Sequence, residues 1–318
     1  MSRLPDEIVV LERGWLSSNN VLLPDSDTAT LIDSGYVAHA PQTVALVRAQ
    51  LGGRSLTRLI NTHCHSDHMG GNAAIRRAFG ADIIIPAGYA PMIEAWDEVG
   101  LQLAGSGQRA ERFGFDAVAD AGDRFQLAGL DWETLSAPGH DRHALIFYCA
   151  ERRILISGDA LWANGFGAMF DTVLGVGDAL GDTRKTLDRI ALLAVDIVIP
   201  GHGAPFTDFA AALERAYKRI EAFEEDPVRM GKNALRACFT FAMIEHQSMA
   251  RKSLPDYLAG TDLYRTLNER YFRLPYDVLA QQLVADLVRA GVLDQDGDRV
   301  RVRPSSAPAR GAVVAGNA

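Results

Sequence analysis

The sequence is poor in cysteine, with three residues of this type in a chain of 318, at Cys64, Cys149 and Cys238. An odd number at these spacings fits no disulfide framework and is typical of a reducing compartment. No apolar run approaches the roughly 20 residues that a membrane-spanning helix needs. No apolar segment typical of a secretory signal follows the first residues. We therefore expect a cytoplasmic protein with no membrane association.

Basic residues are also fewer than acidic ones. The chain has 32 Lys and Arg and 40 Asp and Glu, which gives a net charge of −8 at pH 7. Nucleic acids and anionic membranes favour basic protein surfaces, so this balance weakly disfavours both as main partners. The chain is 48% hydrophobic and 23% charged. It is able to bury a full core, which excludes a disordered chain and a disulfide scaffold.

Short β-branched runs alternate with amphipathic helical patterns across about residues 8–210. Strands that come first as hairpins and then alternate with helices predict a layered α/β architecture with mixed sheets. The expected strands are residues 8–11, 21–23, 28–32, 59–60, 83–85, 125–127, 132–135, 144–149, 153–156 and 196–199. The expected helices are residues 41–51, 71–79 and 183–193.

Strand patterns end near residue 208, and helical patterns follow over residues 209–225, 232–246, 261–271 and 276–289. The last helix runs into Asp296-Gly297 flanked by alternating apolar residues, which predicts a hairpin over 293–302. A helix followed by a hairpin is typical of a winged-helix-like appendage. We expect a catalytic domain over 1–208, a mostly helical domain over 209–304 and a flexible tail over 305–318.

The most informative segment is Asn61-Thr62-His63-Cys64-His65-Ser66-Asp67-His68, which lies between an expected strand and an expected helix. In an extended stretch alternate residues face the same way, so His63 and His65 point together. Asp67 and His68, at the turn into the helix, are able to face a second, adjacent centre. A lone histidine in a polar loop would not indicate a metal site. Four side chains of the types that bind metal, within six residues, do favour one.

Three further segments each place a ligand-type side chain directly after an expected strand. They contain His140 with Asp141, then Asp159, and then His202. Each segment alone is an ordinary glycine turn. Loops that converge from strand ends commonly build metal sites, because the sheet fixes the ligands at little entropic cost.

Taken together, and with the acidic Asp33 at the end of an early strand, these motifs resemble those of the metallo-β-lactamase superfamily. The resemblance covers about residues 8–208. It implies a four-layer αβ/βα sandwich with the active site at one edge, here followed by the winged-helix-like C-terminal domain.

The resemblance also implies two divalent metal ions held at the positions of the family's motifs. His63, His65 and His140 would bind the first ion, Asp67, His68 and His202 the second, and Asp159 would bridge both. Imidazoles and carboxylates of this kind suit zinc, and histidine–carboxylate sites also accept iron or manganese.

The chemistry that follows is hydrolysis by a metal-bridging hydroxide, with Asp67 as the catalytic residue that orients or deprotonates the water. Asp33 and Asp141 are expected to support the ligands from behind. Cys64 lies between two ligands, where alternation aims it away from the metals, and Cys149 lies in a strand. Both cysteines are expected to be packed core residues.

Residues at which the branches of this superfamily differ indicate which branch the sequence resembles. Asp159 stands where similar β-lactamases carry Cys or Ser, and His65 stands where flavo-diiron proteins carry Glu. The pattern looks like the glyoxalase II, lactonase and ribonuclease Z branch. The helical extension resembles the subgroup that includes β-lactamase-like protein 2. Gly167-Ala168-Met169-Phe170-Asp171 replaces the Gly-Arg-Thr-Asp of glyoxalase II, which argues against a glutathione thioester.

We therefore expect a hydrolase of a small ester, thioester or lactone. The alternatives are a metal-dependent ribonuclease or phosphodiesterase, a mononuclear iron persulfide dioxygenase and, last, a non-catalytic binding protein. The nearly neutral appendage lacks a basic-aromatic groove for single strands, so it is expected to serve as a structural cap or a homodimer contact. Apolar residues in 95–123 and 161–181 suggest either an apolar substrate pocket or ordinary core.

Overall fold

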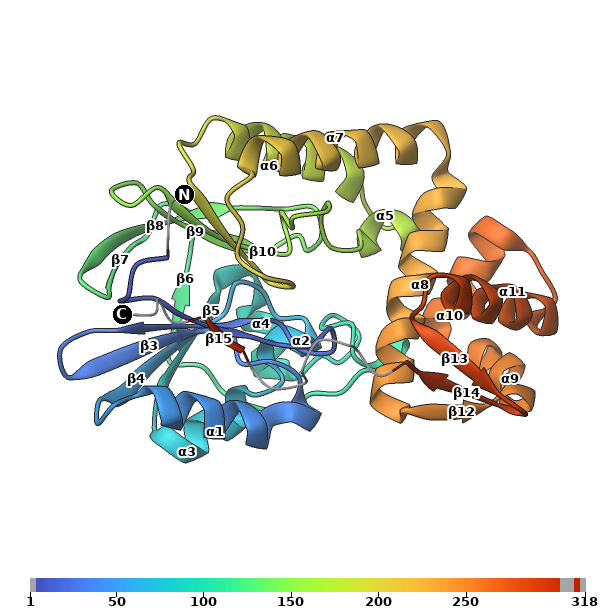
Figure 1. Ribbon diagram of the computed structural model, residues 1–318, viewed down its shortest axis with the longest axis horizontal. Helices are drawn as coiled ribbons and strands as arrows, with labels where there is room; N and C mark the ends of the chain where they lie inside the picture. The colour runs from blue at the N-terminus through green and yellow to red at the C-terminus, as the bar shows by residue number, and fades with distance from the viewer. Residues whose placement is uncertain (1–3, 304–311, 315–318) are drawn as a thin grey trace.

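The computed structural model describes residues 4–303 and 312–314, and most of this chain is built on two β-sheets that lie face to face (Figure 1). The first sheet has the strand order β15–β1–β2–β3–β4–β5–β6. Strands β1 to β3 pair antiparallel, and β3 to β6 pair parallel. The strands are β1 (Val9–Glu12), β2 (Asn20–Pro24), β3 (Thr28–Ile32), β4 (Ser55–Ile60), β5 (Asp82–Pro86), β6 (Ala117–Ala119) and β15 (Ala312–Val314).

The second sheet has the order β11–β10–β9–β8–β7. Its strands are antiparallel except for the parallel pair β10 and β11. They are β7 (Arg124–Leu127), β8 (Leu130–Ser136), β9 (Leu145–Cys149), β10 (Ile154–Gly158) and β11 (Ile197–Pro200). The chain therefore completes one sheet before it begins the other, apart from β15.

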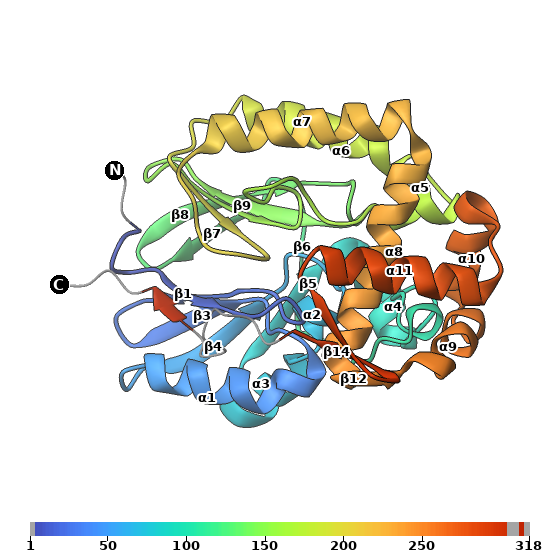
Figure 2. The ribbon, with the colours of Figure 1, turned by 45° about the vertical axis from the view of Figure 1, so that its right-hand side comes forward.

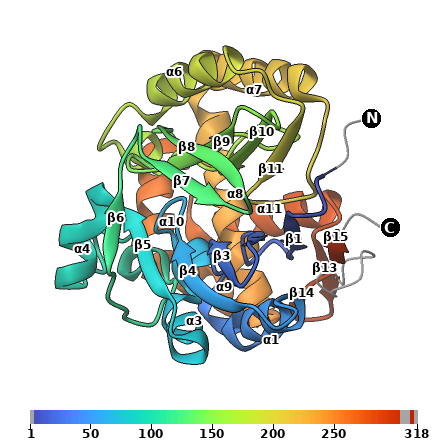
Figure 3. The same cartoon turned by 90° about the vertical axis from the view of Figure 1, so that its left-hand side faces the viewer.

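Helices cover the outer face of each sheet and so complete four layers (Figure 3). α1 (Ala40–Gln50) and α3 (Asn72–Phe79) lie on the first sheet, and α6 (Ala179–Ala191) and α7 (Phe209–Glu225) lie on the second. Shorter helices fill the connections: η1 (Val37–His39), α2 (Ser66–Met69), η2 (Ala87–Tyr89), α4 (Ala90–Ala95), η3 (Ala104–Ser106) and α5 (Phe170–Leu174).

Most strands of the two sheets are buried on both faces, β10 and β11 along their whole length, whereas β6 and β7 at the sheet edges are largely exposed. In β1, Val10 belongs to the core between the two sheets, whereas Leu11 belongs to the core under the helices. In β4, Ile60 belongs to the core between the sheets and Leu59 belongs to the core under the helices. Each sheet is thus a rigid platform whose edge positions the loops that follow its strands.

The C-terminal region is joined to the sandwich by the long helix α8 (Pro227–His246), which runs from the end of α7 toward the last helices (Figure 2). Its other elements are β12 (Ser248–Ala250), η4 (Arg251–Ser253), α9 (Leu254–Gly260), α10 (Asp262–Leu267), the π-helical turn η5 (Asn268–Phe272), α11 (Tyr276–Arg289), β13 (Leu293–Asp296) and β14 (Arg299–Val302). The strands form a small sheet of order β12–β14–β13. None of the helices in the described ranges is both long and apolar enough to cross a membrane.

The expected α/β sandwich with a helical C-terminal region is confirmed, and so is the hairpin over 293–302. The helix expected over 261–271 is present as α10 continued directly by the π-helical turn η5, and it extends to Phe272. The side chain of Asn268 exchanges hydrogen bonds with the backbone of Leu274, just after this helix, at 2.8 and 3.1 Å. The sequence patterns missed β6, β12 and α9.

Two observations bear on the expected domain limits. α7, which begins at the expected boundary, packs against α6 of the sandwich, and one apolar cluster runs from α6 and α7 into the C-terminal helices. Most of the expected flexible tail, residues 305–311 and 315–318, lies outside the described residues. Within it, β15 pairs antiparallel with β1.

Candidate metal centre

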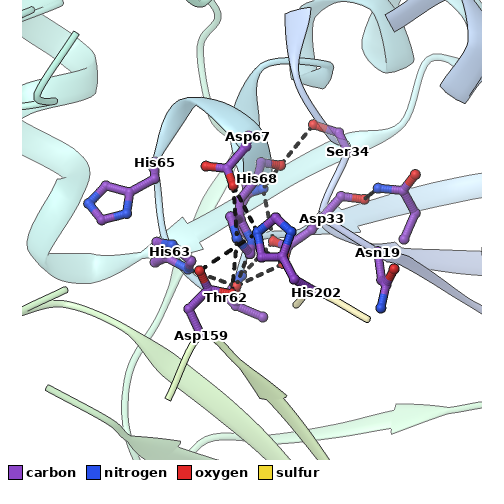
Figure 4. A network of polar contacts seen from close by, with 12 residues as sticks. Asn19, Asp33, Ser34, Thr62, His63, His65, Asp67, His68, Asp159 and His202 are labelled. Atoms are coloured by element: carbon purple, nitrogen blue, oxygen red, sulfur yellow. Dashed lines mark hydrogen bonds and ion pairs between the residues drawn. The ribbon is translucent and has the colours of Figure 1, made fainter. Parts of the chain in front are cut away.

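The candidate site lies where loops from both sheets meet at one edge of the sandwich, and all seven expected ligand residues are there (Figure 4). The first sheet contributes the segment after β4. The second sheet contributes the loop after β8, the end of β10 and the end of β11. The ligand-type residues are His63, His65, Asp67 and His68 from the first sheet, and His140, Asp159 and His202 from the second.

The turn after β4 is shaped by two glycines. His65 is the last extended residue, at φ −73° and ψ 156°, and α2 begins at the next residue. A Cβ added to Gly70 would lie 2.4 Å from the Ser66 carbonyl oxygen, and one added to Gly71 would lie 2.4 Å from the Ser34 carbonyl oxygen. Only glycine allows this close approach, which holds α2 and its ligands against the end of β3.

The donor atoms fall into overlapping groups, in each of which all atoms lie within 4.8 Å of one another: His63, His65 and His140; His63, His68 and Asp159; and Asp67, His68 and His202. The first and third groups are the two ligand sets expected from the sequence. His65 Nδ1 lies 2.8 Å from His140 Nε2, and Asp67 Oδ2 lies 3.0 Å from His202 Nε2.

Asp159 lies between the two expected ligand sets. Its Oδ2 is 3.4 Å from His140 Nε2, and its Oδ1 is 3.5 Å from His68 Nε2. Glycine is required beside it as well, since a Cβ on Gly201 would lie 2.2 Å from Asp159 Oδ1. A carboxylate in this position is able to face two cations at once.

Hydrogen bonds behind the site fix which nitrogen of each ring faces it. His68 Nδ1 donates to Asp33 Oδ2 at 2.8 Å. His63 Nδ1 lies 3.1 Å from Thr62 Oγ1, which in turn donates to Asp33 Oδ2 at 2.8 Å. Both rings therefore turn Nε2 toward the cluster, which is the orientation that supporting carboxylates give to histidines in metal sites.

His140 and His65 are supported from the other side. His140 Nδ1 donates to the Ala168 carbonyl oxygen at 2.6 Å. Asp141 Oδ2 lies 3.6 Å from His65 Nε2 and accepts a short hydrogen bond from the Tyr89 hydroxyl. Sequence reasoning missed Tyr89, because an isolated tyrosine in an apolar helix start gives no signal.

The site passes a simple test for a cation. His63 Nε2 and His68 Nε2 are buried with no hydrogen-bond partner among the described residues. Leaving such atoms unpaired costs roughly 1–3 kcal/mol each. Imidazole nitrogens and carboxylate oxygens together are the donors that zinc, iron and manganese accept. The residues fit the metal ions that the motifs imply.

Burial and the neighbouring charges act in opposite directions on several of these groups. Burial lowers the pKa of His68, but Asp33, Asp159 and Asp67 outweigh it and raise that pKa well above its usual range. Burial, aided by neighbouring histidines, lowers the pKa of His63 well below its usual range and that of His140 to about 4. Burial raises the pKa of Asp159, but His202, His68 and His140 outweigh it, so that this pKa falls well below its usual range. Neutral imidazoles around an ionised carboxylate are the forms that bind metal.

A cavity of about 390 Å³ opens onto the donor cluster. His65, Asp67, His140, Asp159 and His202 line its base. Residues from both stretches expected to shape a pocket line its sides, including Val99, Leu101 and Gln108 from 95–123 and Phe170, Leu174 and Val176 from 161–181.

Two parts of this wall were missed by sequence reasoning. α8 and α10 contribute Ala237, Cys238, Phe241 and Leu263, so the C-terminal region is part of the pocket. Trp15 contacts the His202 ring, with its centroid 5.1 Å away, beside Trp162 of the expected stretch 161–181, whose centroid is 5.4 Å from that ring. These residues are far apart in the sequence and have no common motif.

The chain was compared with known families and proteins. The sequence model of the family described as "Metallo-beta-lactamase superfamily" matches residues 13–202. A hydroxyacylglutathione hydrolase of Rhizobium meliloti is 29% identical over 147 residues, 46% of this chain and 48% of that protein. A second hydroxyacylglutathione hydrolase, from Rhodospirillum rubrum, is 29% identical over 188 residues, which are 58% of this chain and 64% of that protein. The chain thus matches between about half and two thirds of these relatives' length.

Among solved structures, a metallo-beta-lactamase family protein from Thermus thermophilus is similar over 94% of this chain and 99% of its own. Its TM-score is 0.57 and its sequence identity is 18%. At this identity the likeness shows the fold alone, but it includes the C-terminal region that the family match leaves out.

Proposed function

Because the chain belongs to the metallo-beta-lactamase superfamily, we propose that it is a dinuclear metal-dependent hydrolase of an ester, thioester or lactone. The observation that carries this proposal is the convergence of seven ligand-type side chains from two sheets on one buried cluster. Relatives named hydroxyacylglutathione hydrolase support a carbonyl substrate.

In this proposal His63, His65 and His140 hold one ion, Asp67, His68 and His202 hold the other, and Asp159 faces both. Zinc is the proposed metal, with iron or manganese as alternatives for the same donors. Bound divalent ions in such a site lower the pKa of water and polarise a carbonyl oxygen.

The side chains of the protein then orient the reactants. Asp67 lies on the cavity wall with its Oδ2 3.0 Å from His202 Nε2, so its carboxylate is placed at the donor cluster to orient a water and hold its proton. Hydrolysis joins the water oxygen to the carbonyl carbon, breaks the C–O or C–S bond and delivers a proton to the leaving atom. Asp33 acts indirectly, by fixing the orientation of His68.

The proposal is tested by elemental analysis of the purified protein together with a panel of lactones, esters, thioesters and single-stranded RNA. We expect about two divalent ions per chain and hydrolysis of a carbonyl substrate. One iron per chain with oxygen consumption would instead indicate the persulfide dioxygenase, and cleavage of RNA alone would indicate the nuclease.

Variants locate the activity in this cluster. Asp159→Asn should abolish turnover while the circular dichroism spectrum stays unchanged. The matched control is Asp131→Asn, which removes an exposed carboxylate paired with Arg124 and should leave turnover intact. Full activity in Asp159→Asn would refute the proposed site.

The kind of substrate, the cellular location, the domain limits and the oligomeric state remain predictions. A small-molecule substrate agrees with the enclosed cavity, and a cytoplasmic location agrees with three buried, unpaired cysteines. The domain limits and a homodimer contact through the C-terminal region are proposals that limited proteolysis and analytical ultracentrifugation would test.

A further inference from the structure

We infer that the acyl part of the substrate is an uncharged, apolar chain that binds between α5, α8 and α10. The inference rests on the proposed hydrolase function and concerns the wall of the cavity above the donor cluster. It assigns the selection of the substrate to the C-terminal region, which lies outside residues 13–202 that match the family.

The upper wall of the cavity is apolar and is built by neighbouring helices that contact one another. Leu174 and Val176 line it from α5 and the loop that follows, and Ala237, Cys238 and Phe241 line it from α8. Residues 237 and 241 are one helical turn apart, so they present one continuous strip to the cavity. A straight acyl chain that points away from the donor cluster would contact this apolar wall.

Large apolar side chains at the mouth of the cavity remain exposed to solvent in the folded protein. Six large hydrophobic side chains are exposed in the described part of the chain, and three of them line this cavity: Trp15 at 39%, Val99 at 78% and Val176 at 65%. Apolar side chains gathered at one opening mark a binding site more often than scattered ones do. Their gathering here points to a ligand that covers them.

Away from the donor cluster, the cavity wall lacks a cationic group. No lysine or arginine lines it among the residues that the structure describes, and the one carboxylate outside the donor cluster is Asp262. Arg265 pairs with Asp262, Arg142 with Asp171 and Arg109 with Glu245. A carboxylate carried on the acyl chain, away from the proposed metal ions, would therefore have no charge partner in this wall.

Arg270 lies near this mouth and forms no ion pair with a carboxylate among the residues that the structure describes. It lies over the Tyr271 ring, 5.9 Å from the centroid, and close to Gly175. It does not line the cavity, but it is the residue that a carboxylated substrate would recruit. Arg270→Ala therefore tests the opposite interpretation.

The experiment uses the metal-loaded protein and p-nitrophenyl esters of acetate, butanoate, hexanoate and octanoate. Each buried methylene is expected to raise kcat/KM by roughly fourfold until the cavity is filled. The hexanoate ester is compared with the monoester of adipate, which has the same length and ends in a carboxylate. We expect the adipate ester to react at least tenfold more slowly.

Variants assign the preference to the named wall. Ala237→Phe should shift the best chain length to a shorter ester, and Leu174→Arg should raise the rate with the adipate ester relative to the hexanoate ester. Leu192→Arg is the matched control, because Leu192 is 87% exposed and does not line the cavity. Arg270→Ala should leave the hexanoate-to-adipate ratio unchanged.

Calorimetry with N-butylhexanamide and its carboxylate-terminated analogue measures the same preference without turnover. Tighter binding of the neutral amide with no hydrolysis of any ester would refute the proposed function and support the inference. Hydrolysis with a flat chain-length series, or faster reaction of the adipate ester, would overturn the inference and leave the hydrolase in place.

Discussion

Asp33 supports the candidate centre from a left-handed backbone position, at φ 58°. Such a conformation costs a residue other than glycine of order 1 kcal/mol and persists only where its surroundings hold it. Here Thr62 donates to both carboxylate oxygens, through its amide at 2.8 Å and its hydroxyl at 2.8 Å, and His68 donates to Oδ2. The strain places one carboxylate behind two ligand rings at once.

Replacing Asp33 by Asn should therefore weaken metal binding without unfolding the protein. The amide has nearly the same shape but loses the charge that supports His68, so we expect metal affinity to fall by about 10- to 100-fold. Chelator competition measures it, and Asp131→Asn serves as the control. Unchanged affinity would show that Asp33 acts on the fold alone.

Two neighbouring glycines give a sharper residue-scale test. In Gly201→Ala the new Cβ would lie 2.2 Å from Asp159 Oδ1 and 3.0 Å from His68 Cε1, so we expect kcat/KM to fall at least tenfold. In Gly203→Ala nothing lies within 4 Å, but φ is +87°. That variant should lose about 1 kcal/mol of stability and keep its activity. Equal activity in both variants would contradict the position assigned to Asp159.

At the scale of elements, α8 is fastened to the first sheet by a polar contact in an otherwise apolar region. The hydroxyl of the buried Tyr36 donates to Glu245 Oε2 at 2.9 Å and accepts from the Arg109 amide at 3.2 Å. Arg109 also pairs with Glu245. Burial and the Glu245 carboxylate raise the pKa of Tyr36, so the hydroxyl remains a donor at neutral pH.

Tyr36→Phe should loosen this connection. The half-buried Glu245 carboxylate would lose one donor and keep Arg109, so we expect a loss of about 1 kcal/mol and a melting temperature lower by about 2 °C. KM should rise too, because α8 forms part of the cavity wall. Tyr148→Phe, which removes a hydroxyl bonded to the Ala194 carbonyl oxygen near the surface, should have a smaller effect on both. The reverse order would argue against the contact.

Elements with a strong local signal could be predicted from the sequence. α3 ends at Phe79, as the helix expected over 71–79 does, because Gly80 takes the left-handed conformation at φ 70°, and the strands expected over 21–23 and 28–32 are β2 and β3. β12 and α9 were missed because three-residue strands and short helices depend on contacts distant in the sequence. The π-helical form of Asn268–Phe272 was missed because no local pattern indicates the hydrogen bonds between Asn268 and Leu274.

At the scale of the whole molecule, the donor cluster joins the two sheets. His63 and His68 come from the first, and His140 and His202 from the second. The motif spacing predicted this convergence, since strand-end loops meet at one edge. The part of the cavity wall built by Trp15 and α8 was beyond sequence reasoning, because the Trp15 and Phe241 rings lie with their centroids 6.1 Å apart but no periodicity links the two residues.

Metal removal should accordingly destabilise the whole fold. Ions that bind the folded protein alone stabilise it by about 4 kcal/mol at a thousandfold excess over Kd. We expect dialysis against a chelator to lower the melting temperature, and zinc to restore it. In Asp159→Ala most of that recovery should be lost, whereas Asp131→Ala should recover fully. A melting temperature independent of metal would contradict the joining role.

The division of the donors between the sheets also defines where the polypeptide could be cut. The chain passes from β6 to β7 between residues 119 and 124, and every ligand-type residue of the first sheet precedes this turn. A protein expressed as two fragments split there would have one part with His63, His65, Asp67 and His68, and another with His140, Asp159 and His202. Neither fragment would hold a full donor set for the two ions, so reassociation of the fragments would respond to metal concentration.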